Sequence, residues 1–163
     1  MSVITKAELR KSINKILKTI SQTSRMDQST AILKVLQDVP EYKKAKSVGV
    51  FLSMKNEVET RPILDDCTMH NKTIVVPKII SDTEFELVML ENSTTIDSLP
   101  LDKWGIPIPI YDDDHRMLIH PEYTPEVIIV PGVAFDASCQ RMGHGKGYYG
   151  RNIHWNVYPR PLF

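Results

Sequence analysis

The stretch Ser47-Val-Gly-Val-Phe-Leu-Ser53 is a short, nearly continuous apolar run. Runs of this length without polar alternation are typical of strands that are buried on both faces of a sheet. Pro62 favours a helix start, and residues 63–70 continue the predicted helix. A second β-branched run follows at residues 73–76 and ends at Pro77. The order strand, helix, strand predicts a parallel α/β sheet.

Segments on both sides of this unit complete the predicted fold. Residues 5–20 have apolar side chains at helical spacing, and Thr5 with Glu8 makes a capping box at their start. A second helix, limited by Pro40, and two further strands are predicted at residues 27–36, 84–90 and 126–130. We therefore expect an α/β fold with a mostly parallel central sheet and flanking helices, a Rossmann-like three-layer single domain over residues 1–163.

Composition excludes several classes of protein. The chain has 163 residues, of which 42% are hydrophobic and 25% charged, as in one soluble globular domain. Its 20 basic and 20 acidic residues balance, so it lacks the basic field that nucleic-acid binding requires. Cys67 and Cys139 are too few for a disulfide framework or a zinc cluster. No apolar run spans a membrane, and we expect a cytoplasmic protein, with a mitochondrial location as the alternative.

The most informative loop is Arg141-Met-Gly-His-Gly-Lys-Gly-Tyr-Tyr149, which is followed by Gly150. It holds three of the 7 glycines in the chain, and Gly150 is a fourth. Glycine has no Cβ, so a ligand can approach bare backbone N–H groups. The loop is neither a Walker A loop, which needs Ser or Thr after Gly-Lys, nor a dinucleotide fingerprint, which needs Gly where Tyr148 stands.

The other side chains of this loop carry charge and flat surface. Arg141 and Lys146 are cationic, and Tyr148 and Tyr149 are aromatic. Backbone donors, two cations and two rings together indicate a phosphate-bearing ligand with a ring attached. The alternative is a glycine-rich turn whose aromatic residues only pack the core.

Three further features have a functional and a structural interpretation. Glu57 follows the first strand, where open α/β sheets bind ligands, which gives it more weight than an average surface carboxylate, with a solvated loop as the alternative. Trp104, in a segment where Pro107 forbids a helix, is either a stacking wall for a planar ligand or an anchor for the loop. The run from Asp112 to Asp114, with His115, is more typical of a solvated turn than of a metal site.

The segment from Pro131 to Arg151 resembles the signature of the 5-formyltetrahydrofolate cyclo-ligase family, also called methenyltetrahydrofolate synthetase. The family pattern there is Pro-Gly, Phe-Asp, Arg-Leu-Gly and then Gly-Lys-Gly-Tyr-Tyr-Asp. Three other segments resemble the family in the same order along the chain. They are the helix with Lys6 and Arg10, the strand and substrate loop Phe51-Leu-Ser-Met-Lys-Asn-Glu-Val-Glu-Thr60, and the turn Trp104-Gly-Ile-Pro107.

This resemblance implies an ATP-dependent ligase of one-carbon metabolism. The family converts 5-formyltetrahydrofolate to 5,10-methenyltetrahydrofolate and releases ADP and phosphate, with Mg²⁺ as cofactor. The reaction is understood as phosphoryl transfer to the formyl oxygen, attack by N10 of the folate and loss of phosphate. The implied partners are the two small-molecule substrates, with no nucleic acid and no membrane, and we expect a monomer.

The resemblance also implies roles for residues at matching positions. Lys146 and Arg141 are the expected catalytic residues, with Lys146 on the transferring phosphoryl group. The expected ATP-binding residues are Lys6, Ala7, Glu8, Leu9, Arg10, Arg141, Met142, Gly143, His144, Gly145, Lys146, Gly147, Tyr148 and Tyr149. The expected substrate-binding residues are Leu52, Glu57, Trp104, His144, Gly145, Lys146, Gly147 and Tyr148.

The chain departs from the family where magnesium is concerned. Gly150 stands where the family has a metal-binding Asp, so no metal ligand is assigned. The family's second metal-binding Asp, in a further strand and helix, has no counterpart either. Whether Asp136 or the run 112–114 substitutes stays open. The alternatives are a catalytically impaired folate- or nucleotide-binding homologue and an isomerase of sugar phosphates on a related fold, with Glu57 as base.

Overall fold

The computed structural model describes residues 4–110, 116–117 and 124–152. The helices are α1 (Lys6–Leu17), α2 (Gln22–Asp38), α3 (Pro40–Lys44), α4 (Arg61–Met69), the 3₁₀ helix η1 (Ser93–Ser98) and α5 (Tyr148–Asn152). The strands are β1 (Ser47–Val50), β2 (Thr73–Ile79), β3 (Phe85–Leu90), β4 (Arg116–Met117), β5 (Val127–Ile129), β6 (Ala134–Phe135) and β7 (Arg141–Met142). The acidic run 112–114 and the last residues, 153–163, lie outside the described part of the chain.

The main sheet has the strand order β4-β3-β2-β1-β5. β1 pairs in parallel with β2 on one side and with β5 on the other. β3 is antiparallel to both of its neighbours, so it runs against the direction of the other strands of this sheet. The α/β fold with a mostly parallel sheet is confirmed.

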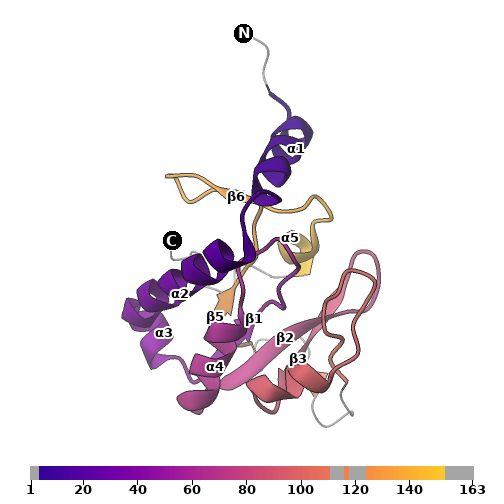
Figure 1. Cartoon of the computed structure of the whole chain (residues 1–163). Helices are drawn as coiled ribbons and strands as arrows, with labels where there is room; N and C mark the ends of the chain where they lie inside the picture. The colour runs from indigo at the N-terminus through magenta and orange to yellow at the C-terminus, as the bar shows by residue number, and fades with distance from the viewer. Residues whose placement is uncertain (1–3, 111–115, 118–123, 153–163) are drawn as a thin grey trace.

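The two faces of the sheet are covered by different elements (Figure 1). On one face, β-branched residues such as Val48 and Ile74 pack against α2, α3 and α4. On the other face, Val75 packs with Phe85 and Leu87 against Tyr148 and Tyr149 of α5. The aromatic residues of the glycine loop therefore belong to the core on this second face, and their packing fixes the loop to the sheet.

The helical ends follow local chemistry. Glu8 N donates to Thr5 Oγ1 at 3.2 Å and Thr5 N donates to Glu8 Oε2 at 2.9 Å, which confirms the capping box. Ser21 Oγ accepts from Ser24 N at 3.1 Å, so α2 begins earlier than its apolar pattern predicts. Pro40 limits α2 and also occupies the first turn of α3.

The prediction that the second strand ends at Pro77 is wrong, since β2 continues to Ile79. β1 pairs with β2 only as far as Val75, whereas β3 accompanies β2 through Pro77. Proline is tolerated in a strand that has a neighbour on one side only, because its missing N–H then breaks no second ladder.

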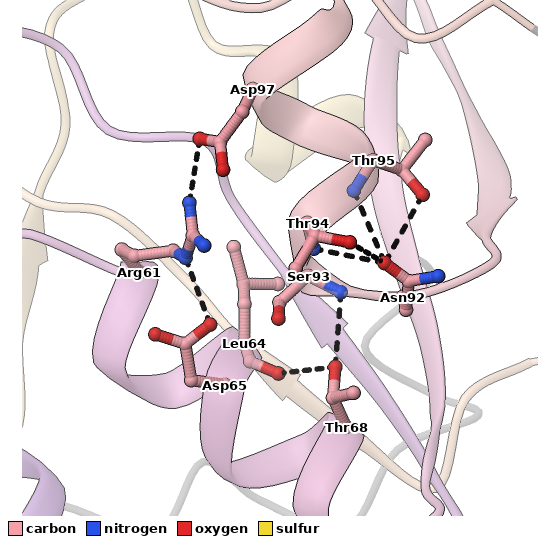
Figure 2. A network of polar contacts seen from close by, with 9 residues as sticks. All are labelled: Arg61, Leu64, Asp65, Thr68, Asn92, Ser93, Thr94, Thr95 and Asp97. Carbon is pink, nitrogen blue, oxygen red and sulfur yellow. Dashed lines mark hydrogen bonds and ion pairs between the residues drawn. The ribbon is translucent and has the colours of Figure 1, made fainter.

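A polar network connects α4 with η1 (Figure 2). Arg61 donates to Asp65 on its own helix at 2.8 Å and to Asp97 of η1 at 2.7 Å. Thr68 Oγ1 accepts from Ser93 N at 3.0 Å and itself donates to the Leu64 carbonyl. These contacts hold the segment after β3 against the sheet-covering helix.

The core between the sheet and helices α2, α3 and α4 encloses the carboxylate of Asp66 of α4, which is only 3% exposed. It accepts hydrogen bonds from Tyr42 Oη and from Gln37 Nε2, each at 2.6 Å. Burial and this contact raise the pKa of the Tyr42 hydroxyl, so tyrosine remains a donor. A buried carboxylate with satisfied oxygens joins three helices.

We expect Asp66→Ala to lower the free energy of unfolding by about 2–3 kcal/mol, because the Tyr42 hydroxyl and the Gln37 amide lose their acceptor inside the protein. The matched control is Asp65→Ala, one position earlier on the same helix, which removes an exposed ion pair and costs under about 1 kcal/mol. Urea unfolding of both variants measures the difference. Equal losses would contradict a structural role for the buried carboxylate.

Candidate functional site

A cavity of about 350 Å³ opens at the carboxyl ends of β1, β2 and β5. Its wall combines residues that follow β1, the β2–β3 hairpin, the Trp104 turn and the glycine loop. The lining residues are Phe51, Leu52, Met54, Glu57, Pro77, Ile79, Phe85, Trp104, Ile106, Pro131, Arg141, Gly143, His144, Lys146, Gly147, Tyr148 and Tyr149. This is the edge at which α/β sheets bind ligands.

The glycine loop owes its shape to two residues in the left-handed region. Gly145 has φ 103° and Gly147 has φ 71°, values that side chains with a Cβ rarely adopt. A Cβ on Gly147 would also lie 2.6 Å from the Arg151 guanidinium. Within the described residues, the backbone N–H groups of Gly143, Gly145 and Gly147 have no hydrogen-bond acceptor. The loop therefore offers unpaired donors beside the cavity.

A hairpin that the sequence did not predict leads into this loop and includes its first two residues. β6 and β7 pair through Ala134 with Met142 and Phe135 with Arg141. Asp136 Oδ1 accepts from the backbone N–H groups of Ser138 and Gln140, both at 2.9 Å, in the hairpin turn. The carboxylate of Asp136 thus stabilises the turn.

Glu57 and His144 join two distant segments at the cavity. His144 Nε2 lies 2.8 Å from Glu57 Oε1, and Met54 N donates to the other oxygen of Glu57 at 2.9 Å. The Glu57 side chain is 10% exposed and that of His144 is 38% exposed. The solvated-loop interpretation of Glu57 is therefore wrong, because its carboxylate is held in the wall of the pocket.

Arg141 is a partly buried cation in the wall of the cavity. Its Nη1 donates to the Pro131 carbonyl at 2.7 Å, and its guanidinium lies 6.0 Å from the centre of the Tyr149 ring. Loss of solvent lowers the pKa of Arg141 from its high ordinary value, and burial raises the pKa of the Tyr149 hydroxyl. The Tyr149 ring also packs against Phe85, with 5.2 Å between ring centres. A cation and a neutral phenol thus meet at the base of the loop.

Lys146 lines the cavity and lies among aromatic rings. Its Nζ is 5.1 Å from the centre of the Trp104 indole and 5.9 Å from that of Tyr148. Lys103 approaches the same indole at 4.3 Å. Trp104 therefore contacts two cations and borders the cavity, and its role as a stacking residue stays a prediction.

The structure brings together most of the residues that the sequence singled out. Ten of them line the cavity, namely Leu52, Glu57, Trp104, Arg141, Gly143, His144, Lys146, Gly147, Tyr148 and Tyr149. Met142, in β7, and Gly145 are not among its lining residues. From α1, Arg10 reaches the loop, since its Nε donates to the Gly143 carbonyl at 2.8 Å.

The other four residues expected from the first helix are placed differently. Lys6, Ala7, Glu8 and Leu9 are exposed, and none of them lines the cavity. Glu8 is instead engaged with Thr5, and the backbone hydrogen bond from Thr5 lowers the pKa of its carboxyl. The binding roles of all these residues stay predictions.

Sequence reasoning missed one wall of the cavity. Pro77, Ile79 and Phe85 come from the β2–β3 hairpin, and their side chains face the pocket because of strand pairing. Phe51 and Met54 were detectable, because they lie within two residues of Leu52 in the segment that resembles the family. The hairpin residues have no local signal of this kind.

Magnesium binding by this chain stays a prediction. Among residues 4–110, 116–117 and 124–152, no group of three or more His, Cys, Asp or Glu side chains is close enough to hold a metal ion. At Gly150, a Cβ would meet nothing within 4 Å, so the position is open. In the same described ranges, no helix is both long and apolar enough to span a bilayer. The monomeric state and the cytoplasmic location stay predictions.

Comparison with known proteins gives a consistent answer. The profile of the 5-formyltetrahydrofolate cyclo-ligase family matches residues 3–158. The chain is 37% identical over 149 residues to the probable 5-formyltetrahydrofolate cyclo-ligase of Schizosaccharomyces pombe, a match that covers 91% of this chain and 71% of that protein. It is 30% identical over 145 residues to the mouse 5-formyltetrahydrofolate cyclo-ligase, covering 88% of this chain and 71% of the relative.

A solved structure shows the same fold. The NMR structure of Aquifex aeolicus 5,10-methenyltetrahydrofolate synthetase superimposes with a TM-score of 0.73 at 28% identity, covering 98% of this chain and 85% of the other. Family profile, relatives and fold thus agree with the motifs that line the cavity. This chain belongs to the 5-formyltetrahydrofolate cyclo-ligase family.

Proposed function

We propose that this chain converts 5-formyltetrahydrofolate to 5,10-methenyltetrahydrofolate with consumption of ATP and release of ADP and phosphate. One arrangement supports the proposal above all. A cation, Lys146, and unpaired glycine-loop amides lie at one end of a cavity whose walls also hold a carboxylate and aromatic rings. The cation and the amides complement an anionic ligand, and the aromatic rings beside them complement a planar one.

The phosphate half of the proposal rests on electrostatics. Phosphoryl transfer needs placement and charge neutralisation more than covalent catalysis by the protein. Lys146 is 48% exposed, so its ammonium is accessible to a ligand. Arg141 lies deeper beside the loop and adds a second positive charge. We assign Lys146 to the phosphoryl group that is transferred and the loop amides to the rest of the triphosphate.

The folate half of the proposal rests on apolar and aromatic residues of the same cavity. Leu52 and Phe51 are buried apolar residues that follow β1, and the Tyr148 and Trp104 rings also line the cavity. A reduced pterin is planar and has N–H donors along one edge, which suit a carboxylate acceptor. We assign Glu57 to this edge, because the contacts from Met54 and His144 hold its carboxylate in place.

The proposed chemistry has two steps. The formyl oxygen of the folate attacks the γ-phosphorus of ATP, so a P–O bond forms to the substrate and the bond to ADP breaks. N10 then attacks the activated formyl carbon, and the five-membered ring closes. The C–O bond breaks, phosphate leaves, and the N10 proton is lost to solvent or a base. The product carries the one-carbon unit as a methenyl bridge.

Magnesium is proposed only as an ion that accompanies ATP. In nucleotide sites Mg²⁺ is bound mainly by phosphate oxygens and water, with one or two carboxylates from the protein. Gly150 provides no carboxylate at the position where the family pattern has Asp. This observation favours the second candidate function, a homologue that binds folate or nucleotide with impaired turnover.

Incubation of the purified chain with 5-formyltetrahydrofolate and Mg-ATP, followed by the absorbance of the methenyl product, tests the proposal. We expect product to accumulate in an ATP-dependent way. Calorimetric binding of both substrates without any product would select the impaired homologue. Absence of both binding and product would overturn the assignment of the cavity.

We expect Lys146→Ala to reduce turnover by about a hundredfold or more, because the transferred phosphoryl group loses a preorganised cationic partner. The matched control is Lys18→Ala at the end of α1, which removes an exposed lysine that does not line the cavity. Initial rates at saturating substrates measure the effect. If both variants lose activity equally, Lys146 has no special role.

We expect Gly150→Asp to raise turnover at limiting magnesium, because it restores a carboxylate where the family has one. The substitution is structurally mild, since a Cβ at this position meets open space and the backbone is not left-handed. Gly150→Asn has nearly the same shape without the charge and serves as control. Turnover measured across a magnesium titration decides the question, and identical curves for the two variants would argue against a metal role at this position.

A further inference from the structure

The tip of the β2–β3 hairpin contacts the glycine loop through Ser81 and Asp82. Asp82 Oδ1 lies 3.2 Å from Lys146 Nζ, and the Tyr148 hydroxyl donates to the Ser81 carbonyl at 3.0 Å. The same hairpin supplies Ile79 and Phe85 to the cavity wall. A segment that has no motif of its own is thus attached to the phosphate end of the site.

This contact places the carboxylate of Asp82 beside the ammonium group of Lys146, to which the proposed function assigns the transferred phosphoryl group. Among the described residues, the ammonium of Lys146 has Asp82 as its ion-pair partner and the faces of Trp104 and Tyr148 as its aromatic neighbours. A carboxylate oxygen and a phosphate oxygen are interchangeable partners for an ammonium group. Asp82 therefore occupies, in the free protein, the place that the proposed function gives to a phosphoryl oxygen.

The pair is weak enough to be exchanged. The Asp82 side chain is 91% exposed and that of Lys146 is 48% exposed, and exposed ion pairs contribute little. A triphosphate carries several charges and also meets the unpaired loop amides. It therefore outcompetes a single carboxylate that water already screens.

We propose that Asp82 is a built-in competitor for the phosphate subsite, which holds Lys146 in the free protein and is displaced when a polyphosphate binds. This inference rests on the proposed assignment of Lys146 to phosphate. Displacement of Asp82 leaves the hydrogen bond from Tyr148 to Ser81 and the packing of Phe85 on Tyr149 in place, so the hairpin stays attached to the loop.

The test is the affinity of the full chain for inorganic tripolyphosphate, measured by titration calorimetry at constant ionic strength. We expect Asp82→Asn to tighten binding by about two- to fivefold, the range that loss of one exposed ion pair allows. Asp82→Glu keeps the charge and retains the affinity of the unmodified chain. Asp38→Asn is the matched control, because Asp38 forms an equally exposed pair with Lys43 at 3.3 Å, on helices that do not line the cavity. It leaves the affinity unchanged.

The same substitution in a Lys146→Ala background isolates the pair. We expect Asp82→Asn to have no effect there, because the carboxylate no longer has a cation to occupy. Tightening of equal size in both backgrounds would mean a general effect of net charge and would overturn the proposal. Unchanged or weaker binding by Asp82→Asn in the otherwise unmodified chain would overturn it as well.

The outcome separates this inference from the proposed activity. If tightening is found without turnover, Asp82 is confirmed as a competitor and the ligase activity fails. If turnover is found without tightening, the activity stands and the role of Asp82 fails. If tripolyphosphate binds neither the unmodified chain nor Asp82→Asn, both the phosphate assignment and the competitor role are wrong.

Discussion

The parallel pairing of β1 with a strand on each side is the constraint on which the remaining structure depends. Val48 pairs with Ile74 of β2 and with Val127 of β5, so the segment is enclosed laterally as well as on both faces. Gly49 suits this close approach, because a Cβ there would lie 3.1 Å from the Ile128 side chain and 3.3 Å from Pro125, which is tighter than an ordinary van der Waals contact. Since β1, β2 and β5 point the same way, the residues that follow them meet at one edge, and the cavity forms there.

The candidate site is stabilised by contacts between segments that are remote in sequence. Three contacts fix the glycine loop. Arg10 of α1 donates to the Gly143 carbonyl, Glu57 forms a hydrogen bond with His144, and Tyr149 packs on Phe85. None of these contacts uses the N–H groups of Gly143, Gly145 and Gly147, which have no acceptor in the described part of the chain. The loop is thus positioned by side chains and carbonyls, while its donors remain available to a ligand.

Membership of the cyclo-ligase family favours an active ligase, whereas Gly150 favours a homologue with impaired turnover. The cations, the glycines and the aromatic residues of the family pattern are present and lie around one cavity. Position 150 lacks the carboxylate, yet the space for it is open. Under the proposed function, ligand binding and a metal contact at position 150 therefore depend on different residues, since Gly150 follows the glycine loop.

The sequence by itself determined the elements whose cause is local. The capping box at Thr5, the buried run of β1, the proline start of α4 and the positive φ of the loop glycines all follow from residue chemistry within a few positions. Tertiary structure decided the rest, because it depends on contacts between distant parts of the chain. The extension of β2 through Pro77 requires β3 beside it. The pairing of Glu57 with His144, and of Asp82 with Lys146, requires the strands to be placed first, since such partners have no local pattern that marks them in advance.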